Sequence, residues 1–191
     1  MRNEIEIIQA LAHGDDQALK VLYKLYSGKI YNTALSYTKN VEDSEEITQD
    51  VFVKIYKGAA SFKGESSLNT WIYRIAVNTS LNYIKKKNRF TFFKNTLIRP
   101  PTIDFEHPNV LLENKEKAAV LYKVVDGLPN KQKTAFILSY IEELPRQEVA
   151  NIMKTTLKAV ESLLQRAKKN MRPELEIIYL HQRQSKKKLP K

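Results

Sequence analysis

Cysteine is absent from the chain, and glycine is scarce, with 5 among 191 residues. Without cysteine the protein forms neither a disulfide nor a thiolate metal site, which is typical of a reducing cytoplasm. Scarce glycine disfavours sandwiches and barrels, because their many tight turns need it. No apolar run approaches the ~18 residues of a membrane-spanning helix. The first residues, MRNEIEIIQALAHGDD, carry acids where a signal peptide needs an apolar segment, so we predict a cytoplasmic protein.

Residues that favour helices are abundant, and so is positive charge. Leucine, lysine, glutamate, alanine and isoleucine predominate, and 42% of the residues are hydrophobic, which is ample for a folded core. The formal net charge of +11 indicates an anionic partner, such as nucleic acid, a membrane surface or an acidic protein. A merely soluble basic protein would have the same charge. No alternation of strands and helices is apparent, so we predict an all-α fold.

A proline-rich stretch, TLIRPPTIDFEHPN, separates two helix-rich parts of the chain. Its Pro100, Pro101 and Pro108 preclude a continuous helix and indicate a linker. The last stretch, LHQRQSKKKLPK, is polar and basic and is predicted to fray. We therefore predict two small helical domains, at residues 1–90 and 113–172. Residues 91–112 form the linker between them, and residues 173–191 form a basic tail.

Apolar side chains recur at helical spacing along the first domain. The stretch DDQALKVLYKLYSGKIYNTALSYTKN indicates one long helix or two short ones, with its apolar positions at Leu22, Tyr26, Ile30 and Ala34. The next helix, in VEDSEEITQDVFVKIYKGAASF, has Asp43 or Ser44 as its predicted N-cap. A third, LNTWIYRIAVNTSLNYIKKKNR, follows a loop and presents one apolar side, formed by Trp71, Ile72, Ile75 and Ala76.

Two polar surfaces are predicted on these helices. One is acidic and consists of Glu42, Asp43, Glu45, Glu46 and Asp50. Paired carboxylates suit hydrolysis or a metal, but no nucleophile or glycine-rich loop accompanies them, and His13, His107 and His181 are dispersed. A docking face for a basic partner explains the acids better, with a solvated helix as the alternative. The other surface is a stripe of cations and amides that suits nucleic acid, formed by Arg74, Asn78, Asn82, Lys85, Lys86 and Arg89.

The second domain contains a helix-turn-helix pattern. A short helix in LPRQEVANIM, in which Val149, Ala150 and Met153 can pack, is followed by the turn KTT and a longer basic helix that Thr156 can cap. The apolar side of that helix is predicted at Leu157, Val160, Leu163, Leu164, Ala167 and Met171. Its outer face offers donors that fit a major groove, on Lys158, Ser162, Gln165, Arg166 and Lys169. Glu161 lies at the edge, where a carboxylate can accept from cytosine N4. An ordinary amphipathic helix explains the pattern equally well.

The two halves together resemble a known family. DSEEITQDVFVKIYKGAASFKGESSLNTWIYRIAVNTSLNYIKKKNR resembles the second conserved region of extracytoplasmic-function (ECF) sigma factors, and LPNKQKTAFILSYIEELPRQEVANIMKTTLKAVESLLQRAKKNMR resembles their fourth region. The resemblance covers about residues 15–172. It implies a bacterial transcription initiation factor that has no active site, cofactor or small-molecule substrate. Its implied partners are the β′ coiled coil of RNA polymerase core, promoter DNA and a separate anti-sigma factor, because no added sensory domain is apparent.

The resemblance also assigns residues to three tasks. Core polymerase is implied to bind Asp43, Glu45, Glu46, Gln49, Asp50 and Phe52. The −10 element, as a melted strand, is implied to bind Phe62, Lys63, Ser66, Asn69, Trp71, Arg74, Asn78, Asn82, Lys85, Lys86 and Arg89. Of the aromatic residues, Phe62 in its polar loop is the better stacking candidate, and Trp71 is expected in the core. The −35 element, as duplex, is implied to bind Arg146, Thr156, Lys158, Ala159, Glu161, Ser162, Gln165, Arg166 and Lys169.

The chain departs from the family pattern at several positions. Lys154 stands in the turn where relatives often have glycine, and Val77, Glu161 and Leu163 stand where basic residues are frequent. Glu161 is expected either to tune base choice or to pair with Lys158 or Gln165. Two other functions stay open. One is a regulator that binds an operator by itself, which should carry a receiver-like βα pattern that is missing here. The other is a basic interaction or RNA-binding module with no promoter role.

Overall fold

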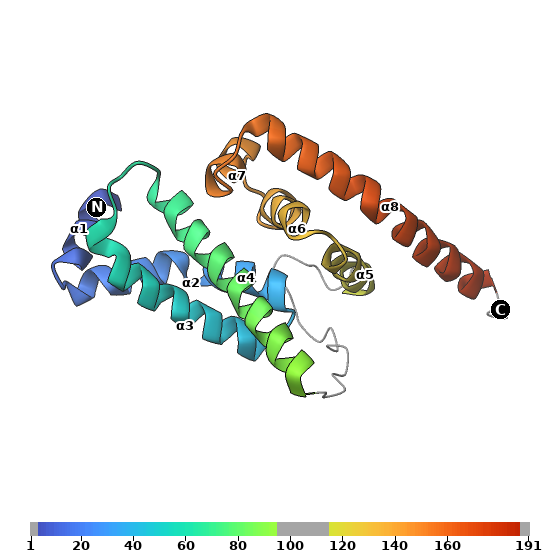
Figure 1. Ribbon diagram of the computed structural model, residues 1–191, viewed down its shortest axis with the longest axis horizontal. Helices are drawn as coiled ribbons and strands as arrows, with labels where there is room; N and C mark the ends of the chain where they lie inside the picture. The colour runs from blue at the N-terminus through green and yellow to red at the C-terminus, as the bar shows by residue number, and fades with distance from the viewer. Residues whose placement is uncertain (1–3, 95–114, 188–191) are drawn as a thin grey trace. The chain divides into compact units, whose positions relative to one another are not determined.

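The computed structural model describes residues 4–94 and 115–187, which form helices and contain no β-strand in those ranges (Figure 1). The all-α prediction is confirmed. The chain divides into two compact units at His107 and Pro108, with the short segment Asn151–Lys154 grouped with the first. No helix in the described ranges is long and apolar enough to cross a membrane. Each unit is described separately below.

The first unit is a bundle in which α2 packs against both α3 and α4, as the blue-to-green ribbons show (Figure 1). Its elements are α1 Glu4–Ala12, α2 Asp16–Thr38, α3 Val41–Gly58, the 3-10 turn η1 Ala59–Ser61 and α4 Leu68–Lys94. The four apolar positions predicted on the first long stretch are all buried, and that stretch is one helix rather than two. The core therefore forms where the helical spacing of apolar residues placed it.

The junction between α2 and α3 differs from the prediction. Asn40 is the N-cap of α3, because its side-chain oxygen accepts a hydrogen bond from the Asp43 amide at 2.8 Å. The predicted caps, Asp43 and Ser44, lie inside the first turn. Lys39 ends α2 in the left-handed conformation with φ 53°, and its amide donates to the Leu35 carbonyl. The turn is thus only two residues long, and α3 begins at Val41.

The fourth helix extends further than predicted. It begins after Ser67, whose hydroxyl oxygen accepts from the Thr70 amide at 3.1 Å, and it continues to Lys94 inside the predicted linker. Ile72 and Ala76 are buried as predicted, and Trp71 and Ile75 are only half-buried at the edge of the core. The rest of the predicted linker, with its three prolines, lies outside the described residues.

The second unit is a smaller helical domain. Its elements are α5 Lys115–Asp126, α6 Asn130–Phe136, the π-helical turn η3 Ile137–Ile141, α7 Arg146–Ile152 and α8 Leu157–Lys187. Four of the six apolar positions predicted on α8 are buried, namely Val160, Leu164, Ala167 and Met171. The prediction for Leu157 is wrong: as the first residue of α8 it lies beside the turn and is 40% exposed, and Leu163 is half-buried.

The C-terminal helix passes through a proline. The predicted tail from residue 173 is helical as far as Lys187, although Pro173 has no amide hydrogen to donate to the preceding turn. The helices α5 and α6 pack against the apolar side of α8. The recognition-helix candidate is therefore the first part of a much longer helix.

We predict that Asn40→Ala destabilises the first unit by about 1 kcal/mol, because the α3 cap is lost. Urea unfolding followed by the fluorescence of Trp71, the single tryptophan, measures this unit alone. The control is Asn40→Asp, which keeps a side-chain acceptor and should unfold near the wild-type midpoint. Equal loss in both variants would mean that the cap contributes little.

Candidate functional surfaces

The acidic surface lies along α3, and the structure divides it. Glu42, Glu45, Glu46 and Asp50 are exposed to solvent. Asp43 is not, since only 15% of its side chain is exposed. Asp43 therefore contributes little to the exposed acidic face, because the register of α3 turns this side chain toward α4.

Asp43 is instead the centre of a polar link between α3 and α4. The Tyr83 hydroxyl is hydrogen-bonded to Asp43 Oδ1 at 2.8 Å and to Glu46 Oε2 at 2.9 Å. Lys87 Nζ lies 2.5 Å from the other oxygen of Asp43. Burial and the hydrogen bonds to the two carboxylates raise the pKa of Tyr83 above its ordinary value. Tyr83 and Lys87 stand 40 and 44 residues from Asp43, and no local pattern predicts their pairing with it.

A shallow pocket of about 390 Å³ adjoins the exposed acids, between α2 and α3. It is lined by Tyr23, Ser27, Gly28, Tyr31, Glu45, Thr48 and Gln49. Tyr23, Ser27 and Tyr31 follow one another at intervals of four residues, so they lie on one side of α2. Burial, and then the charge of Glu45, raise the pKa of Tyr31. The α2 wall of this pocket was not predicted, although the four-residue spacing of its side chains is visible in the sequence.

Phe52 does not belong to the exposed surface. It is 7% exposed and lies in the core, where Tyr23 covers it at a ring-centroid distance of 4.8 Å. Phe52 therefore presents little of its own surface, and its predicted part in core binding stays a prediction. Tyr23, at 56% exposure, is the aromatic side chain that this region offers to a partner.

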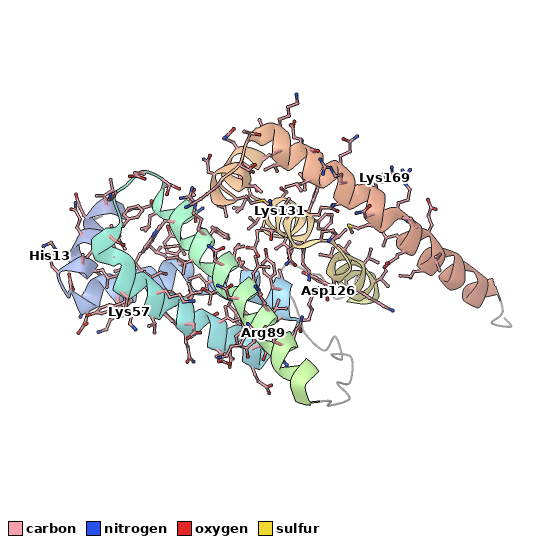
Figure 2. The ribbon with its side chains drawn as sticks, viewed as in Figure 1. His13, Lys57, Arg89, Asp126, Lys131 and Lys169 are labelled. Atoms are coloured by element: carbon pink, nitrogen blue, oxygen red, sulfur yellow. The ribbon has the colours of Figure 1, made fainter. Side chains whose placement is uncertain are left out.

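The predicted stripe of amides and cations lies on α4. Asn78, Asn82, Lys85, Lys86 and Arg89 are exposed, and Arg74 is half-buried (Figure 2 labels Arg89). Val77, which stands where relatives often have a cation, is buried. In the loop before α4, Lys63 is exposed and Ser66 is half-buried, and Asn69, the second residue of α4, is half-buried as well.

Phe62 and Trp71 pack against each other rather than standing free. Their ring centroids lie 5.1 Å apart in a tilted arrangement, and both rings contact the core of the first unit. Trp71 also covers Gly58, where a Cβ atom would lie 3.1 Å from the indole. Trp71 therefore lies at the core as expected, and Phe62, the better stacking candidate of the two, shares that position.

The helix-turn-helix of the second unit is present as predicted. Thr156 caps α8, since its hydroxyl oxygen accepts from the Ala159 amide at 3.2 Å. Lys154 occupies the left-handed region with φ 50°, which explains why glycine suits this turn. Val149 and Ala150 of α7 are buried beneath the turn, and Met153 is half-buried.

The outer face of α8 carries most of the residues predicted to contact duplex DNA. Lys158, Glu161, Gln165, Arg166 and Lys169 are exposed, and Ala159 and Ser162 are half-buried (Figure 2 labels Lys169). Arg166 donates to the Ser162 hydroxyl at 2.9 Å. This face therefore presents cations, one amide and one carboxylate together.

Glu161 pairs with a residue of α7 rather than with either expected neighbour on α8. Arg146 Nη1 lies 3.8 Å from Glu161 Oε1, with 53% and 51% of the two side chains exposed. Lys168 Nζ lies 4.9 Å from the ring centroid of Tyr140. A hydrogen bond from Lys168, more than the nearby charge of Arg146, lowers the pKa of Tyr140, although burial opposes it. Sequence analysis missed Tyr140 and Lys168.

Both halves of the chain match family models. Residues 22–90 match Sigma-70 region 2, and residues 115–171 match Sigma-70, region 4. The two matches come in the expected order and cover well over half of the chain. The chain belongs to the sigma-70 family. It is an alternative sigma factor, which binds RNA polymerase core and directs promoter recognition and transcription initiation. This overturns both rival predictions, the autonomous operator-binding regulator and the RNA-binding module.

Named relatives agree with this family. The chain is 26% identical over 180 residues to the RNA polymerase sigma-H factor of Pseudomonas aeruginosa, covering 85% of this chain and 89% of the relative. It is 27% identical over 179 residues to the ECF RNA polymerase sigma-E factor of Escherichia coli, covering 85% and 88%.

Two solved structures share its fold. CnrH in complex with the cytosolic domain of CnrY has a TM-score of 0.67 at 18% identity, covering 91% of this chain and 97% of that one. The sigma factor RpoE in complex with the anti-sigma factor NepR from Bartonella quintana has a TM-score of 0.65 at 20% identity, covering 83% and 96%.

We predict that Tyr83→Phe destabilises the first unit by about 1–3 kcal/mol at neutral pH, because two carboxylates lose a partner. The folded-state pKa of Tyr83 is raised, so its contribution is present below the unfolded pKa of about 10 and is lost as pH rises further. Unfolding followed by Trp71 fluorescence between neutral and alkaline pH measures both effects.

The matched control for that measurement is Tyr56→Phe, which removes an exposed hydroxyl from α3. It should leave both the neutral stability and the alkaline decline unchanged. If Tyr83→Phe declines with pH as steeply as the wild type, the link does not carry the alkaline dependence.

Proposed function

We propose that RNA polymerase core docks on the exposed acids of α3 together with the α2–α3 pocket, through its β′ coiled coil. Exposed carboxylates on a chain of net charge +11 support this. On such a chain a basic partner is attracted electrostatically only to a surface where acidic side chains are clustered. The docking residues are Glu45, Glu46, Gln49 and Asp50, joined by Tyr23 across the pocket. Asp43 and Phe52 act beneath the surface, by holding α3 in place.

We assign the −10 element to α4 and the loop before it. From Asn78 to Arg89 the exposed stripe runs roughly 16 Å along the helix, at 1.5 Å per residue, so it can follow several nucleotides of one strand. Amides suit base edges and cations suit phosphates. Phe62 and Trp71 support the loop from the core and leave Lys63 free to contact DNA. Promoter opening then follows from binding energy that favours the separated strand, and the chain itself catalyses no reaction.

We assign the −35 element to the outer face of α8, which recognises it as duplex in the major groove. In this proposal residues 1–90 bind core and the −10 element, and residues 113–172 bind the −35 element. Residues 91–112 link them, although the first four of these residues still belong to α4. A separate anti-sigma protein is the proposed regulator. The RpoE structure contains such a protein, so this fold can accommodate one.

We predict that Gly28→Arg weakens binding to RNA polymerase core by at least about 10-fold, because it places bulk and positive charge at the acidic pocket. A Cβ atom at Gly28 would meet no atom within 4 Å, so the backbone there has room for a side chain to begin. Fluorescence anisotropy with labelled sigma factor and purified core measures the affinity.

The matched control for the pocket is Gly28→Ala, which adds a helix-favouring methyl group and should bind core as the wild type does. If Gly28→Arg binds core with unchanged affinity while remaining folded, the pocket is not part of the docking site.

We predict that Asn78→Ala combined with Asn82→Ala lowers promoter-dependent transcription on duplex templates, because captured bases lose their hydrogen-bond partners. Reconstituted holoenzyme on duplex and pre-melted templates measures the effect, and pre-melting should restore much of the activity. Core affinity should be unchanged. Equal loss on both templates would contradict a role in melting, and promoter-independent transcription by wild type would contradict the proposed function itself.

A further inference from the structure

The ion pair between Arg146 and Glu161 joins the two helices of the helix-turn-helix. Arg146 is the first residue of α7, and Glu161 lies in the second turn of α8. The two charges offset each other. Because about half of each side chain is exposed, both remain accessible to a ligand. A surface pair of this kind adds little stability, typically below about 1 kcal/mol, so its position needs another explanation.

Glu161 stands among the side chains that face duplex DNA. Lys158 lies one turn before it and Gln165 one turn after it, on the same side of α8. A lone carboxylate there would be repelled by the DNA phosphates. The guanidinium of Arg146 offsets that charge and holds the carboxylate at the α7 side of the helix.

Tyr140, in the π-helical turn, is a neighbour of this pair. A hydrogen bond from Lys168, and to a smaller extent Arg146, lower the pKa of its hydroxyl. Lys168 follows Glu161 by seven residues, two turns along the same side of α8, and covers the Tyr140 ring. The pair thus joins the first residue of α7 to the second turn of α8.

We propose that Glu161 recognises a cytosine in the −35 element and that Arg146 is the positioning residue that makes this possible. The proposal rests on the −35 role of α8 given above. In the major groove cytosine offers the N4 amino donor, which suits a carboxylate acceptor. Guanine and thymine present acceptor oxygens in the major groove, and these repel a carboxylate. Adenine presents a donor, but its N7 acceptor lies beside that donor. Cytosine is therefore the preferred base.

The test uses reconstituted holoenzyme and promoters whose −35 element is randomised one position at a time, with transcript yield sequenced for each base. Wild type should prefer cytosine at one position by about 10-fold. Glu161→Gln should move that preference to adenine, which a glutamine contacts through N6 and N7. The matched control, Glu176→Gln on the same helix, should leave every preference unchanged.

The role of Arg146 is tested in the same assay. Arg146→Ala should reduce the cytosine preference to about 3-fold or less, and Arg146→Lys should restore part of it by keeping the charge. If Arg146→Ala alters thermal unfolding but not base preference, the residue is only structural and the positioning role is overturned.

Two other outcomes separate this inference from the proposed function. Promoter-dependent transcription whose base preferences are the same for wild type and Glu161→Gln would overturn the cytosine contact and leave the −35 role of α8 intact. If no position of the −35 element affects transcription by wild type, the proposed −35 role fails, and this inference fails with it.

Discussion

The hydrogen bond between the Asn40 side chain and the Asp43 amide sets where α3 begins. A helix turns by a fixed angle at each residue, so its starting point determines the direction of every later side chain. In this register Asp43 meets α4, Glu45 and Gln49 border α2, and Asp50 faces solvent. A start one residue later would turn each of them by about 100°. Which acidic side chains of α3 contact α4 and which face solvent therefore depends on that cap.

The core and the course of the chain could be predicted from the spacing of apolar residues. Leu22, Ile30, Val160 and Leu164 are buried because helical periodicity sorts strongly apolar side chains onto one side. The Thr156 cap was predictable for a similar reason, since only local chemistry is involved. The α3 cap was not, because Asn40, Asp43 and Ser44 are all good caps within five residues, and their ranking depends on where α2 ends.

The functional surfaces were predicted less completely, because partners distant in sequence decide them. Whether Asp43 is exposed depends on Tyr83, and whether Phe52 is exposed depends on Tyr23. Neither pairing follows from local pattern. Glu161 shows the same limit: its expected partners were on its own helix, and its observed partner is on the preceding one. Residues that face solvent without a distant partner, such as Asn82 and Lys169, were placed correctly.

The left-handed backbone at Lys154 has a consequence for how the gene can change. Single-base changes in either lysine codon lead to threonine, asparagine and several other residues. Threonine is β-branched and disfavours a positive φ, whereas asparagine adopts it readily. A substitution at this position therefore affects the stability of the turn first, through its backbone conformation, whatever it does to DNA binding. Of these substitutions, Lys154→Asn is the one that the backbone of the turn tolerates best.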